Sequence, residues 1–476
     1  MPEPGVGLIY LPGLEALAAE LSDACTLYEI EPQAFWYKAG DDPCEPYALD
    51  EAKFAALLDL GKPVLMHSVG CPVASTNGFD TRQLDGLRRS LEILKPAWWS
   101  DHASFVSTGE ARRGMGFLMP PIQNRRSVAM IADRIKTLQD MFGLPFAFET
   151  GVNYFAPRDG DMPDGAFWGE IARAADCGIL LDLHNIWSNQ RNGRCAADTV
   201  IAQLPCEHVW EIHVAGGQDH KGYWLDSHCG LPQAEVIALL ERTAPALPDL
   251  KAINFEIVPE YVDVETIGAE DVRALLRRLR AIGSRARPSE ASQPVALQTG
   301  RPARDPKDEP EALSPVEWET RLRHGIDARC RGEISGAGSD PAFDIYIDLI
   351  LMARRGSIVD ALPLTARYLW LALGEDGLEA LLRRYLADAA PEAFMADEAR
   401  NFARFAGREG GVPHLADISA FEFAAQKAAE TGEAQLARFG CDPVPLLTAI
   451  RKGVPPPAPP PMAIEVEVRP PVRQAA

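Results

Sequence analysis

Short apolar runs in the N-terminal part of this 476-residue chain repeatedly end in a carboxylate or an imidazole. The polar side chains at these ends, and in the loop after the seventh run, are Glu29, Glu31, His67, Asp101, His102, Glu149, Asp182, His184, Asn185, His213, Asp226, His228 and Glu256. Imidazole nitrogens mixed with carboxylate oxygens suit iron, zinc or manganese. If these segments converge in space, the chemistry they favour is that of a metal centre.

The elements that must position these side chains are short strands alternating with amphipathic helices. The apolar runs span 6–10, 27–31, 63–67, 97–101, 145–149, 179–183, 209–214 and 252–257. Helical patterns lie between them, for example at 50–60, 81–94, 125–142 and 233–243. Eight strands interleaved with helices in a segment of this length are typical of a (β/α)8 barrel. We therefore predict an α/β fold with a TIM barrel over residues 1–284.

The strand ends of such a barrel meet at one mouth, because the C-terminal ends of all eight strands point the same way. Several carboxylates and imidazoles gathered there cannot all stay charged and unpaired beside low-dielectric walls. Bound cations would compensate the carboxylates and accept the imidazole lone pairs. The donors exceed the needs of one ion, so we expect two or three ions, with Glu149 or Glu256 as bridging groups.

Other polar residues of the same region have weaker claims. His208 precedes its strand and His220 lies in a loop, so both are expected to be structural or surface residues. Glu29 and Glu31 fit a metal site and a pair of mouth ion pairs equally well. Asp101 is expected to orient a neighbouring imidazole, as carboxylates behind metal ligands do.

The C-terminal part of the chain has a different composition. Residues 285–314 lack apolar periodicity and are rich in Pro, Ser, Arg and Asp, which predicts a linker. Ser314 followed by Pro315 predicts a capped helix start. Apolar residues at helical spacing then predict an all-helical domain over 315–452. The proline-rich stretch 453–476 is expected to be a disordered tail.

Charge and cysteine content exclude several classes of protein. Lysine plus arginine total 47 against 68 aspartates and glutamates, a formal net charge of -21. Such a surface repels phosphate backbones and anionic membranes, so neither nucleic acid nor a membrane is an expected partner. Nine cysteines without a CxxC pair argue against a disulfide framework and against a thiolate zinc ribbon. The N-terminus has no basic segment typical of a signal peptide, and no apolar run has the length of a membrane span, so we expect a cytoplasmic protein.

Seven short motifs occur in a fixed order along the barrel part. They are HSVG at 67–70, SDH at 100–102, FET at 148–150, LLDLHN at 180–185, EIHVAG at 211–216, DSH at 226–228 and FE at 255–256. In this order they resemble the multinuclear non-heme iron-dependent oxidases, the family of the methanobactin-biosynthesis oxidase. The resemblance covers residues 5–280 and implies a barrel of the xylose-isomerase-like type with two or three irons in mixed Fe(II)/Fe(III) valence. It also implies that O2 is a co-substrate, used to modify a residue, most often cysteine, in a ribosomally made precursor peptide.

Matched motif by motif, the resemblance implies a set of metal ligands. They are His67, His102, Glu149, Asp182, Asn185, His213, Asp226, His228 and Glu256. The family usually reads Asp-x-Asn-Asn where this chain has Asp182-Leu183-His184-Asn185, and it often has histidine at the position of Gly217. These departures affect a third metal position, at which His184 is a candidate replacement for a missing donor. Asp101 and His184 are the candidate catalytic residues.

The helical domain has a counterpart as well. TARYLWLALGEDGLEALLRRYL at 365–386, NFARFAG at 401–407 and PHLADISAFEFA at 413–424 resemble the partner proteins encoded beside these oxidases. Those partners are implied to capture the leader of the precursor peptide. Catalytic and recognition parts would then be fused in one chain, and tethering would replace a bimolecular encounter by an effective concentration that reaches the millimolar range.

Three other functions fit parts of the pattern. A divalent-metal barrel hydrolase of the endonuclease kind has a similar ligand set, and Arg112, Arg113, Arg125 and Arg126 are the basic cluster that would favour it. A sugar isomerase would rely on carboxylates and a catalytic lysine, whereas this mouth is richer in histidine. A non-enzymatic metal- or peptide-binding adaptor would act through the helical domain.

Overall fold

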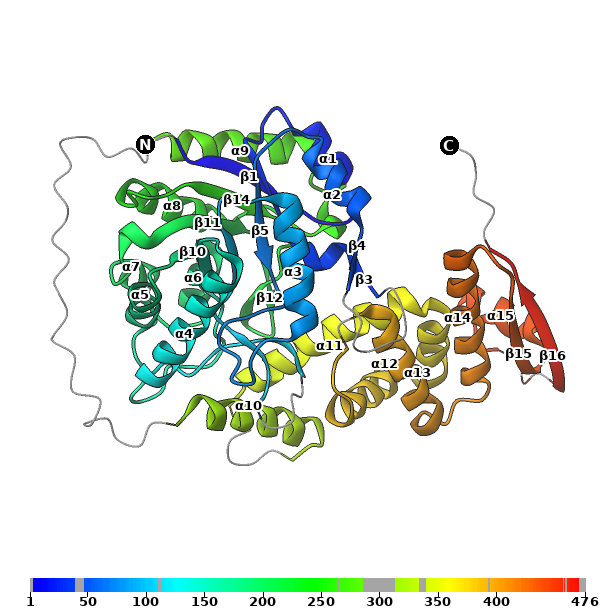
Figure 1. Ribbon diagram of the computed structural model, residues 1–476. Helices are drawn as coiled ribbons and strands as arrows, with labels where there is room; N and C mark the ends of the chain where they lie inside the picture. Colours follow the sequence, from blue (N-terminus) through cyan, green and yellow to red (C-terminus); the bar gives the residue numbers. More distant parts are fainter. Residues whose placement is uncertain are drawn as a thin grey trace. The chain divides into compact units, whose positions relative to one another are not determined.

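The computed structural model describes residues 3–38, 47–109, 114–263, 266–285, 313–333, 340–392, 394–456, 458 and 460–470. The chain forms two compact units (Figure 1). The first consists of Met1–Arg112 and Leu118–Arg321, and the second of Arg113–Phe117 and Leu322–Ala476. Residues 315–321 thus belong to the first unit, although the sequence placed them in the helical domain. Of the predicted linker 285–314, residues 286–312 lie outside the described part of the chain.

A closed barrel of eight parallel strands forms the centre of the first unit, with the strand order β1-β14-β11-β10-β9-β6-β5-β2. The strands are β1 (Gly5–Tyr10), β2 (Leu27–Ile30), β5 (Val64–Ser68), β6 (Trp99–His102), β9 (Phe146–Glu149), β10 (Gly178–Asp182), β11 (Val209–Ala215) and β14 (Ala252–Glu256). Each of the eight predicted runs overlaps one of these strands, with ends that agree to within two residues. The predicted TIM barrel is therefore confirmed.

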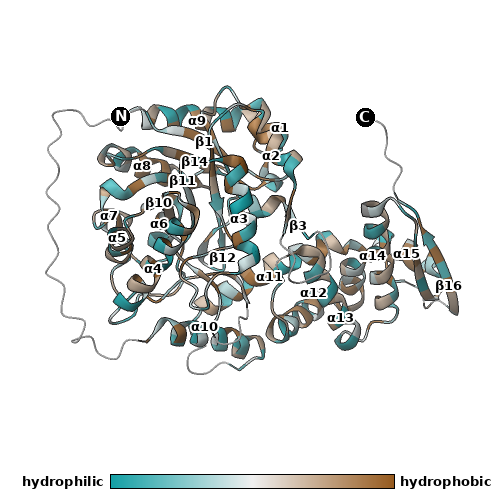
Figure 2. Cartoon of the chain, viewed as in Figure 1, coloured by the Kyte–Doolittle hydropathy of each residue, from teal (hydrophilic) through white to brown (hydrophobic). Residues whose placement is uncertain are grey.

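The sequence forms these strands because they are buried on both faces. β9, β10 and β14 have no exposed residue, as expected for parallel strands covered by helices. The covering helices are α1 (Glu15–Glu20), α2 (Glu51–Leu58), α3 (Thr81–Leu94), α4 (Arg125–Phe142), α5 (Asp164–Ala175), α6 (Leu183–Arg191), α7 (Ala197–Ile201), α8 (Ala234–Thr243) and α9 (Ala269–Gly283). Figure 2 shows apolar residues concentrated on the barrel strands, while the outer helices carry hydrophilic residues on their outer faces.

Shorter elements decorate the barrel loops. They are β3 (Trp36–Tyr37), β4 (Ala48–Leu49), β7 (Phe105–Ser107), β8 (Gly114–Met119), β12 (Gly217–His220), β13 (Tyr223–Asp226) and the 3-10 turns Pro32–Phe35, Cys206–His208, Ala244–Ala246 and Pro259–Tyr261. β12 and β13 form an antiparallel hairpin directly after β11. This hairpin ends in Asp226 and so returns a carboxylate to the rim of the barrel.

Strand register brings the predicted donors to one rim. His102 lies opposite Glu149 in the β6–β9 pair, and Asp182 lies opposite His213 in the β10–β11 pair. Ala215 lies opposite Glu256 in the β11–β14 pair. These residues occupy the last positions of their strands or lie close to them, so strand ends supply most of the donors at the mouth.

The second unit is largely helical. Its elements are α10 (Pro315–Cys330), which begins in the first unit, α11 (Ala342–Ala361), α12 (Pro363–Asp388), α13 (Met395–Glu409), α14 (Leu415–Thr431), β15 (Gln435–Cys441), α15 (Pro443–Lys452) and β16 (Pro461–Val468). The predicted capped start of α10 is present: Ser314 accepts from the Glu317 N–H, and the Glu317 carboxylate accepts from the Ser314 N–H. Among the described helices, none combines the length and the apolar character needed to cross a membrane.

Two predictions for this part of the chain are wrong. The domain at 315–452 is not all helical, because 435–441 forms β15, and the tail 453–476 is not disordered throughout, because 461–468 forms β16. The two strands pair antiparallel, with Gln435 opposite Val468. The prediction followed the high proline content of this stretch and overlooked the alternation of apolar and charged residues in MAIEVEV at 462–468. Pro461 stands at the first position of its strand, where the missing N–H costs no ladder hydrogen bond.

Candidate metal centre

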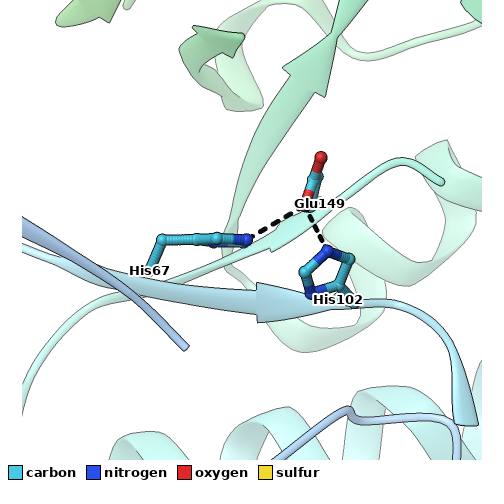
Figure 3. Close-up of side chains that lie close together, drawn as sticks. All are labelled: His67, His102 and Glu149. Atoms are coloured by element: carbon cyan, nitrogen blue, oxygen red, sulfur yellow. Dashed lines mark ion pairs between the residues drawn. The ribbon is translucent and has the colours of Figure 1, made fainter. Parts of the chain in front are cut away.

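The first group of donors at the mouth is His67, His102 and Glu149 (Figure 3). Nε2 of His102 lies 2.9 Å and Nε2 of His67 lies 3.1 Å from Oε2 of Glu149. Neither contact has the alignment of a hydrogen bond, so this oxygen is buried without a donor. Two ring nitrogens and a carboxylate oxygen that lie within 4.8 Å of one another are close enough to serve as ligands of one ion.

Neighbouring residues fix the orientation of this group. Nδ1 of His67 lies 2.8 Å from Oγ of Ser100, which leaves Nε2 directed at Glu149. Asp101 accepts the backbone N–H of His102 at 2.6 Å and that of Cys71 at 2.9 Å. Its Oδ1 is 3.7 Å from Nδ1 of His102, beyond hydrogen-bond distance. These contacts are those of a residue that holds two segments of backbone together, and they give no support to the predicted catalytic role of Asp101.

The second group shares Glu149 with the first. It is formed by Glu149, Asp182, His213 and Glu256, with one ligand atom from each lying within 4.8 Å of the others. Nδ1 of His213 is 3.1 Å from Oε2 of Glu256. Both of these atoms, and Oδ2 of Asp182, are buried without a hydrogen-bond partner. Glu149 belongs to both groups, and Glu256 lies both in this group and 3.5 Å from Nε2 of His228, so the two predicted bridging carboxylates each lie between two sets of donors.

The sequence explains how Asp182 and Asn185 reach this group. Asp182 ends β10 and caps α6, because its Oδ1 accepts the backbone N–H of Asn185 at 2.8 Å. Its other oxygen is thereby turned toward the mouth. The side-chain amide of Asn185 donates to Glu149 at 3.4 Å and to the Thr150 carbonyl at 3.3 Å, while its Oδ1 has no partner.

A third group lies where the β12–β13 hairpin returns to the rim. Nε2 of His228 is 3.1 Å from Oδ1 of Asp226 and 3.5 Å from Oε2 of Glu256. His228 has a φ of 49°, a left-handed conformation that is uncommon outside glycine and marks a constrained backbone. Asp226 and His228 are thus brought beside Glu256, as predicted.

His184 lies next to this third group in a different role. Nε1 of Trp224 donates to its Nε2 at 3.1 Å, and its Nδ1 lies 3.2 Å from Oδ1 of Asp226. An indole nitrogen can only donate, so Nε2 is the acceptor and the neutral ring carries its proton on Nδ1. Neither nitrogen then has a free lone pair for a cation. The expectation that His184 replaces a missing metal donor therefore gains no support here and stays a prediction, and the contact of its Nδ1 with Asp226 is a close ion-pair contact.

Gly217 is part of the same arrangement. A Cβ at this position would lie 2.6 Å from Nε2 of His184, 2.5 Å from Nε1 of Trp224 and 2.3 Å from the Leu225 carbonyl oxygen. Any larger side chain would have to displace backbone as well as the His184–Trp224 pair. The glycine is therefore explained by close packing, and no donor reaches the mouth from this position.

The charges of the buried groups explain why cations fit the mouth. Burial raises the pKa of Asp182 well above its usual value, and the nearby Asp226 and Glu149 charges raise it further. Burial lowers the pKa of His102, but Glu149 and Asp101 together outweigh burial, so the pKa lies well above its usual value. In the same way burial raises the pKa of Glu149, but His102 and His67 together outweigh burial and hold this pKa well below its usual value. Without a cation, protonated imidazoles must balance the carboxylates, and bound metal would take over that role.

A layer of polar residues below the mouth was missed by the sequence analysis, apart from Glu29. Glu29, Glu211 and His213 form a further group of close ligand atoms, and Asn254 hydrogen-bonds to both glutamates. Burial raises the pKa of Glu29 to about 7, with the Glu211 charge adding to the effect. Glu211 lies two residues before His213 on β11, so the period of two was the signal that could have placed both inside the barrel.

The other predicted residues belong to none of these groups of donors. Nδ1 of His208 lies 2.7 Å from the Cys177 carbonyl oxygen, a structural contact. Glu31 follows β2 near the mouth, where burial raises its pKa, the charge of His67 lowers it and the charge of Glu256 raises it. Of the basic cluster, Arg112 and Arg113 lie outside the described residues, and Arg125 lies 3.7 Å from Glu170.

A cluster in the second unit provides a contrast. His414, Asp417 and Cys441 also place ligand atoms within 4.8 Å of one another. Here, however, Oδ2 of Asp417 accepts from the Gly440 N–H at 2.9 Å and lies 3.2 Å from Nδ1 of His414 in a hydrogen bond. The contacts join the start of α14 to the end of β15, and the carboxylate oxygen is satisfied, unlike those at the barrel mouth.

Comparisons with known proteins identify relatives of the chain. The chain is 32% identical over 239 residues to a UPF0276 protein of Anaeromyxobacter sp. (strain Fw109-5), a match that covers 50% of this chain and 79% of the relative. It is 32% identical over 216 residues to a UPF0276 protein of Chromobacterium violaceum, covering 44% of this chain and 76% of the relative.

Two solved structures with similar barrels match this chain with low TM-scores. An L-ribulose 3-epimerase matches with a TM-score of 0.37 and 14% identity, covering 60% of this chain and 94% of its own. A xylose isomerase domain protein of Alicyclobacillus acidocaldarius matches with a TM-score of 0.39 and 16% identity, covering 60% and 99%. Similarity at this level says nothing about substrate.

A family model decides the assignment. The model described as "RiPP precursor modification enzyme MbnB/TglH/ChrH" matches residues 18–274, more than half of the chain and all of the donor groups at the mouth. The resemblance stated from the barrel motifs is thereby confirmed. The chain belongs to the MbnB/TglH/ChrH family of RiPP precursor modification enzymes.

Proposed function

We propose that this protein is an iron- and O2-dependent oxidase that modifies a residue, most often cysteine, in a ribosomally made precursor peptide. Family membership supports a peptide substrate. The observation that carries the metal part of the proposal is Oε2 of Glu149, a buried oxygen without a hydrogen bond between the Nε2 atoms of His67 and His102. A buried carboxylate oxygen without a donor is costly unless a cation is its partner.

The donors divide into sets for two or three irons in mixed Fe(II)/Fe(III) valence. His67, His102 and Glu149 form one set, and Glu149, Asp182, His213 and Glu256 form the next. The remaining donors, Asp226, His228 and Asn185, are available for a third iron. Mixed imidazole and carboxylate ligands suit iron among the available divalent metals.

Bound iron would supply the redox chemistry and a site at which the peptide thiolate and O2 meet. O2 takes up the electrons and protons that the peptide residue loses, and is reduced to water. The chain's own residues hold this site in shape: Ser100 orients His67, and Asp101 joins the backbones of His102 and Cys71. His184 holds its proton on Nδ1 toward Asp226 and so keeps that carboxylate directed at the mouth. Held geometry of this kind accounts for much of the rate advantage of an enzyme.

The second unit is proposed to recognise the leader of the precursor peptide in cis. The support is the resemblance of 365–386, 401–407 and 413–424 to the partner proteins of these oxidases. A tethered leader would present the core of the peptide to the barrel at a high effective concentration. We also propose that the protein acts in the cytoplasm, where its cysteines, all unpaired among the described residues, stay reduced.

The decisive experiment uses the full chain with a cysteine-bearing peptide encoded near its gene. Protein loaded with ferrous iron is expected to retain two or three irons, to consume O2 in the presence of the peptide, and to change the mass of the cysteine-bearing segment. Retention of zinc without O2 consumption, together with cleavage of a phosphodiester or isomerisation of a sugar, would instead establish the divalent-metal hydrolase or isomerase alternative. Peptide binding without any change in mass would identify an adaptor.

A further inference from the structure

The interior of the barrel below the mouth is polar, which is unusual for this fold. Glu29 on β2, Glu211 and His213 on β11 and Asn254 on β14 are fully buried. β2 and β14 are separated by β1 in the sheet, so side chains from them that touch must point into the barrel. Branched apolar residues normally fill this space. Two carboxylates here are costly unless they serve the groups above them.

His213 connects this inner layer to the mouth. Its Nδ1 lies 3.1 Å from Oε2 of Glu256, and its Nε2 lies 2.7 Å from Oε2 of Glu29. A neutral imidazole carries one proton, and the nitrogen that bears it is the one facing the better acceptor. Both nitrogens face a carboxylate without an aligned hydrogen bond, but the contact with Glu29 is the shorter one, so Glu29 has the stronger influence on which nitrogen is left for a metal.

Glu29 is itself held from below. Nδ2 of Asn254 donates to Oε2 of Glu29 at 3.1 Å and to Oε1 of Glu211 at 2.5 Å. Nε1 of Trp98 donates to Oε2 of Glu211 at 2.9 Å. Each oxygen of Glu211 thus faces an N–H donor, whereas Oε1 of Glu29 is buried without a hydrogen-bond partner. The chain of contacts runs from Trp98 through Glu211, Asn254 and Glu29 to His213.

The neighbouring strand leaves room for this chain of contacts. A Cβ on Gly7 of β1 would lie 2.4 Å from Oδ1 of Asn254. The barrel therefore accepts Asn254 in this position only because residue 7 is glycine.

We propose that Glu29, supported by Asn254 and Glu211, is a positioning residue of the metal centre, which keeps the proton of His213 on Nε2 and leaves Nδ1 for the ion shared with Glu149, Asp182 and Glu256. The inference rests on the proposed metal function and adds to it a residue outside the ligand set. Carboxylates behind metal-bound histidines act in this way in general, and their loss costs about 10–100-fold in metal affinity or activity.

The test compares Glu29→Gln with the unmodified full chain. Glutamine keeps the shape but removes the anion, and its amide can donate to Nε2 and move the proton to Nδ1. We expect Fe(II) affinity, measured anaerobically by competition with a chelator, to fall about 10–100-fold at one of the bound ions. The melting temperature of the metal-free variant should not fall, because a buried repulsion with Glu211 is removed. A merely structural role would lower the melting temperature and leave affinity unchanged.

Two further variants keep the result interpretable. Glu319→Gln removes a buried carboxylate of the same unit that bonds to Thr76 and Gly109, away from every donor group, and should leave Fe(II) affinity unchanged. Glu29→Asp keeps the anion and should retain more affinity than Glu29→Gln. If the unmodified chain binds no iron, the proposed function fails. If it binds iron and both Glu29 variants bind it equally well, only the role of Glu29 is overturned.

Discussion

The indole N–H of Trp224 donates a hydrogen bond of 3.1 Å to Nε2 of His184 and thereby decides which nitrogen of this buried imidazole carries the proton. Trp224 is in turn packed edge-on against Trp187, with ring centroids 5.3 Å apart, and lies under the guanidinium of Arg191 at 4.4 Å. The indole is therefore fixed on two sides, and the direction of its N–H is set by packing.

Replacement of Trp224 by phenylalanine tests this relationship. Trp224→Phe keeps an aromatic ring beside Trp187 but leaves Nε2 of His184 buried without a donor, which should lower the free energy of unfolding by about 1–3 kcal/mol. Denaturant unfolding of the metal-free protein measures the change. Trp187→Phe is the matched control, because it removes an indole that does not bond to His184. Equal stability of Trp224→Phe and the unmodified chain would show that His184 does not depend on this donor.

Substitution of Glu149 should remove more bound metal than substitution of His102. Glu149→Gln disturbs two groups of donors, whereas His102→Ala disturbs one. We therefore expect both variants to lose iron and activity together, with the larger loss of iron in Glu149→Gln and with circular dichroism unchanged. Metal analysis after gel filtration gives the iron-to-protein ratio, with Glu319→Gln as the control. Full turnover by either variant without iron would contradict the proposed metal centre.

Glu319 predicts a pH dependence of stability that is separate from the metal centre. Burial raises the pKa of this carboxyl to about 7, although Thr76 and Gly109 donate hydrogen bonds to it. The folded state therefore binds a proton that the unfolded chain, with an ordinary pKa, has released. The resulting stabilisation is present in acid and is lost as the pH rises through about 7. Its magnitude is on the order of 3 kcal/mol.

The measurement is the melting temperature of the unmodified chain relative to Glu319→Gln across this range. The melting temperature of the unmodified chain minus that of Glu319→Gln should shrink or change sign as the pH is raised from about 5 to about 8. The reason is that only the carboxyl group titrates in this range. A difference that grows with pH would mean that the carboxylate form is the stable one in the folded protein.

A buried ion pair supports the second unit. Nε of Arg354 donates to Glu398 at 2.6 Å, and both side chains are about 5% exposed or less. Arg354 also donates to the carbonyls of Ala389 and Ala390 and lies 4.3 Å from the centre of the Tyr385 ring. Arg354→Ala leaves the Glu398 carboxylate buried without its cation, and should cost about 3–5 kcal/mol.

Selective loss of the second unit is the expected result of that change. Limited proteolysis and denaturant unfolding should show α11 to α14 opening at lower denaturant, while Fe(II) retention by the barrel stays unchanged. An exposed pair such as Arg438 and Glu465 is the control, because surface ion pairs contribute little. Equal effects of Arg354→Ala and Arg438→Ala would contradict the assigned role of the buried pair.

The sequence by itself determined the barrel and the set of side chains at its mouth. Each of the eight apolar runs overlaps a barrel strand, because burial on both faces imposes a continuous apolar pattern that is local in sequence. The position of a residue at the end of a strand is equally local. His67, His102, Glu149, Asp182, His213 and Glu256 were therefore predicted to share one rim, and they do. The alternation in 462–468 was also local, but proline content outweighed it in the prediction.

Only the tertiary structure decided which atom of each side chain faces which partner. The bond from Asn254 to Glu29 spans 225 residues of sequence, and that from Trp98 to Glu211 spans 113. Such contacts depend on the closure of the barrel, which no local pattern records. The same closure places the indole N–H of Trp224 on Nε2 of His184, a contact that no local pattern predicts. Residue types and spacing select the elements and the donors, whereas the directions of hydrogen bonds and lone pairs are set by packing between segments distant in the chain.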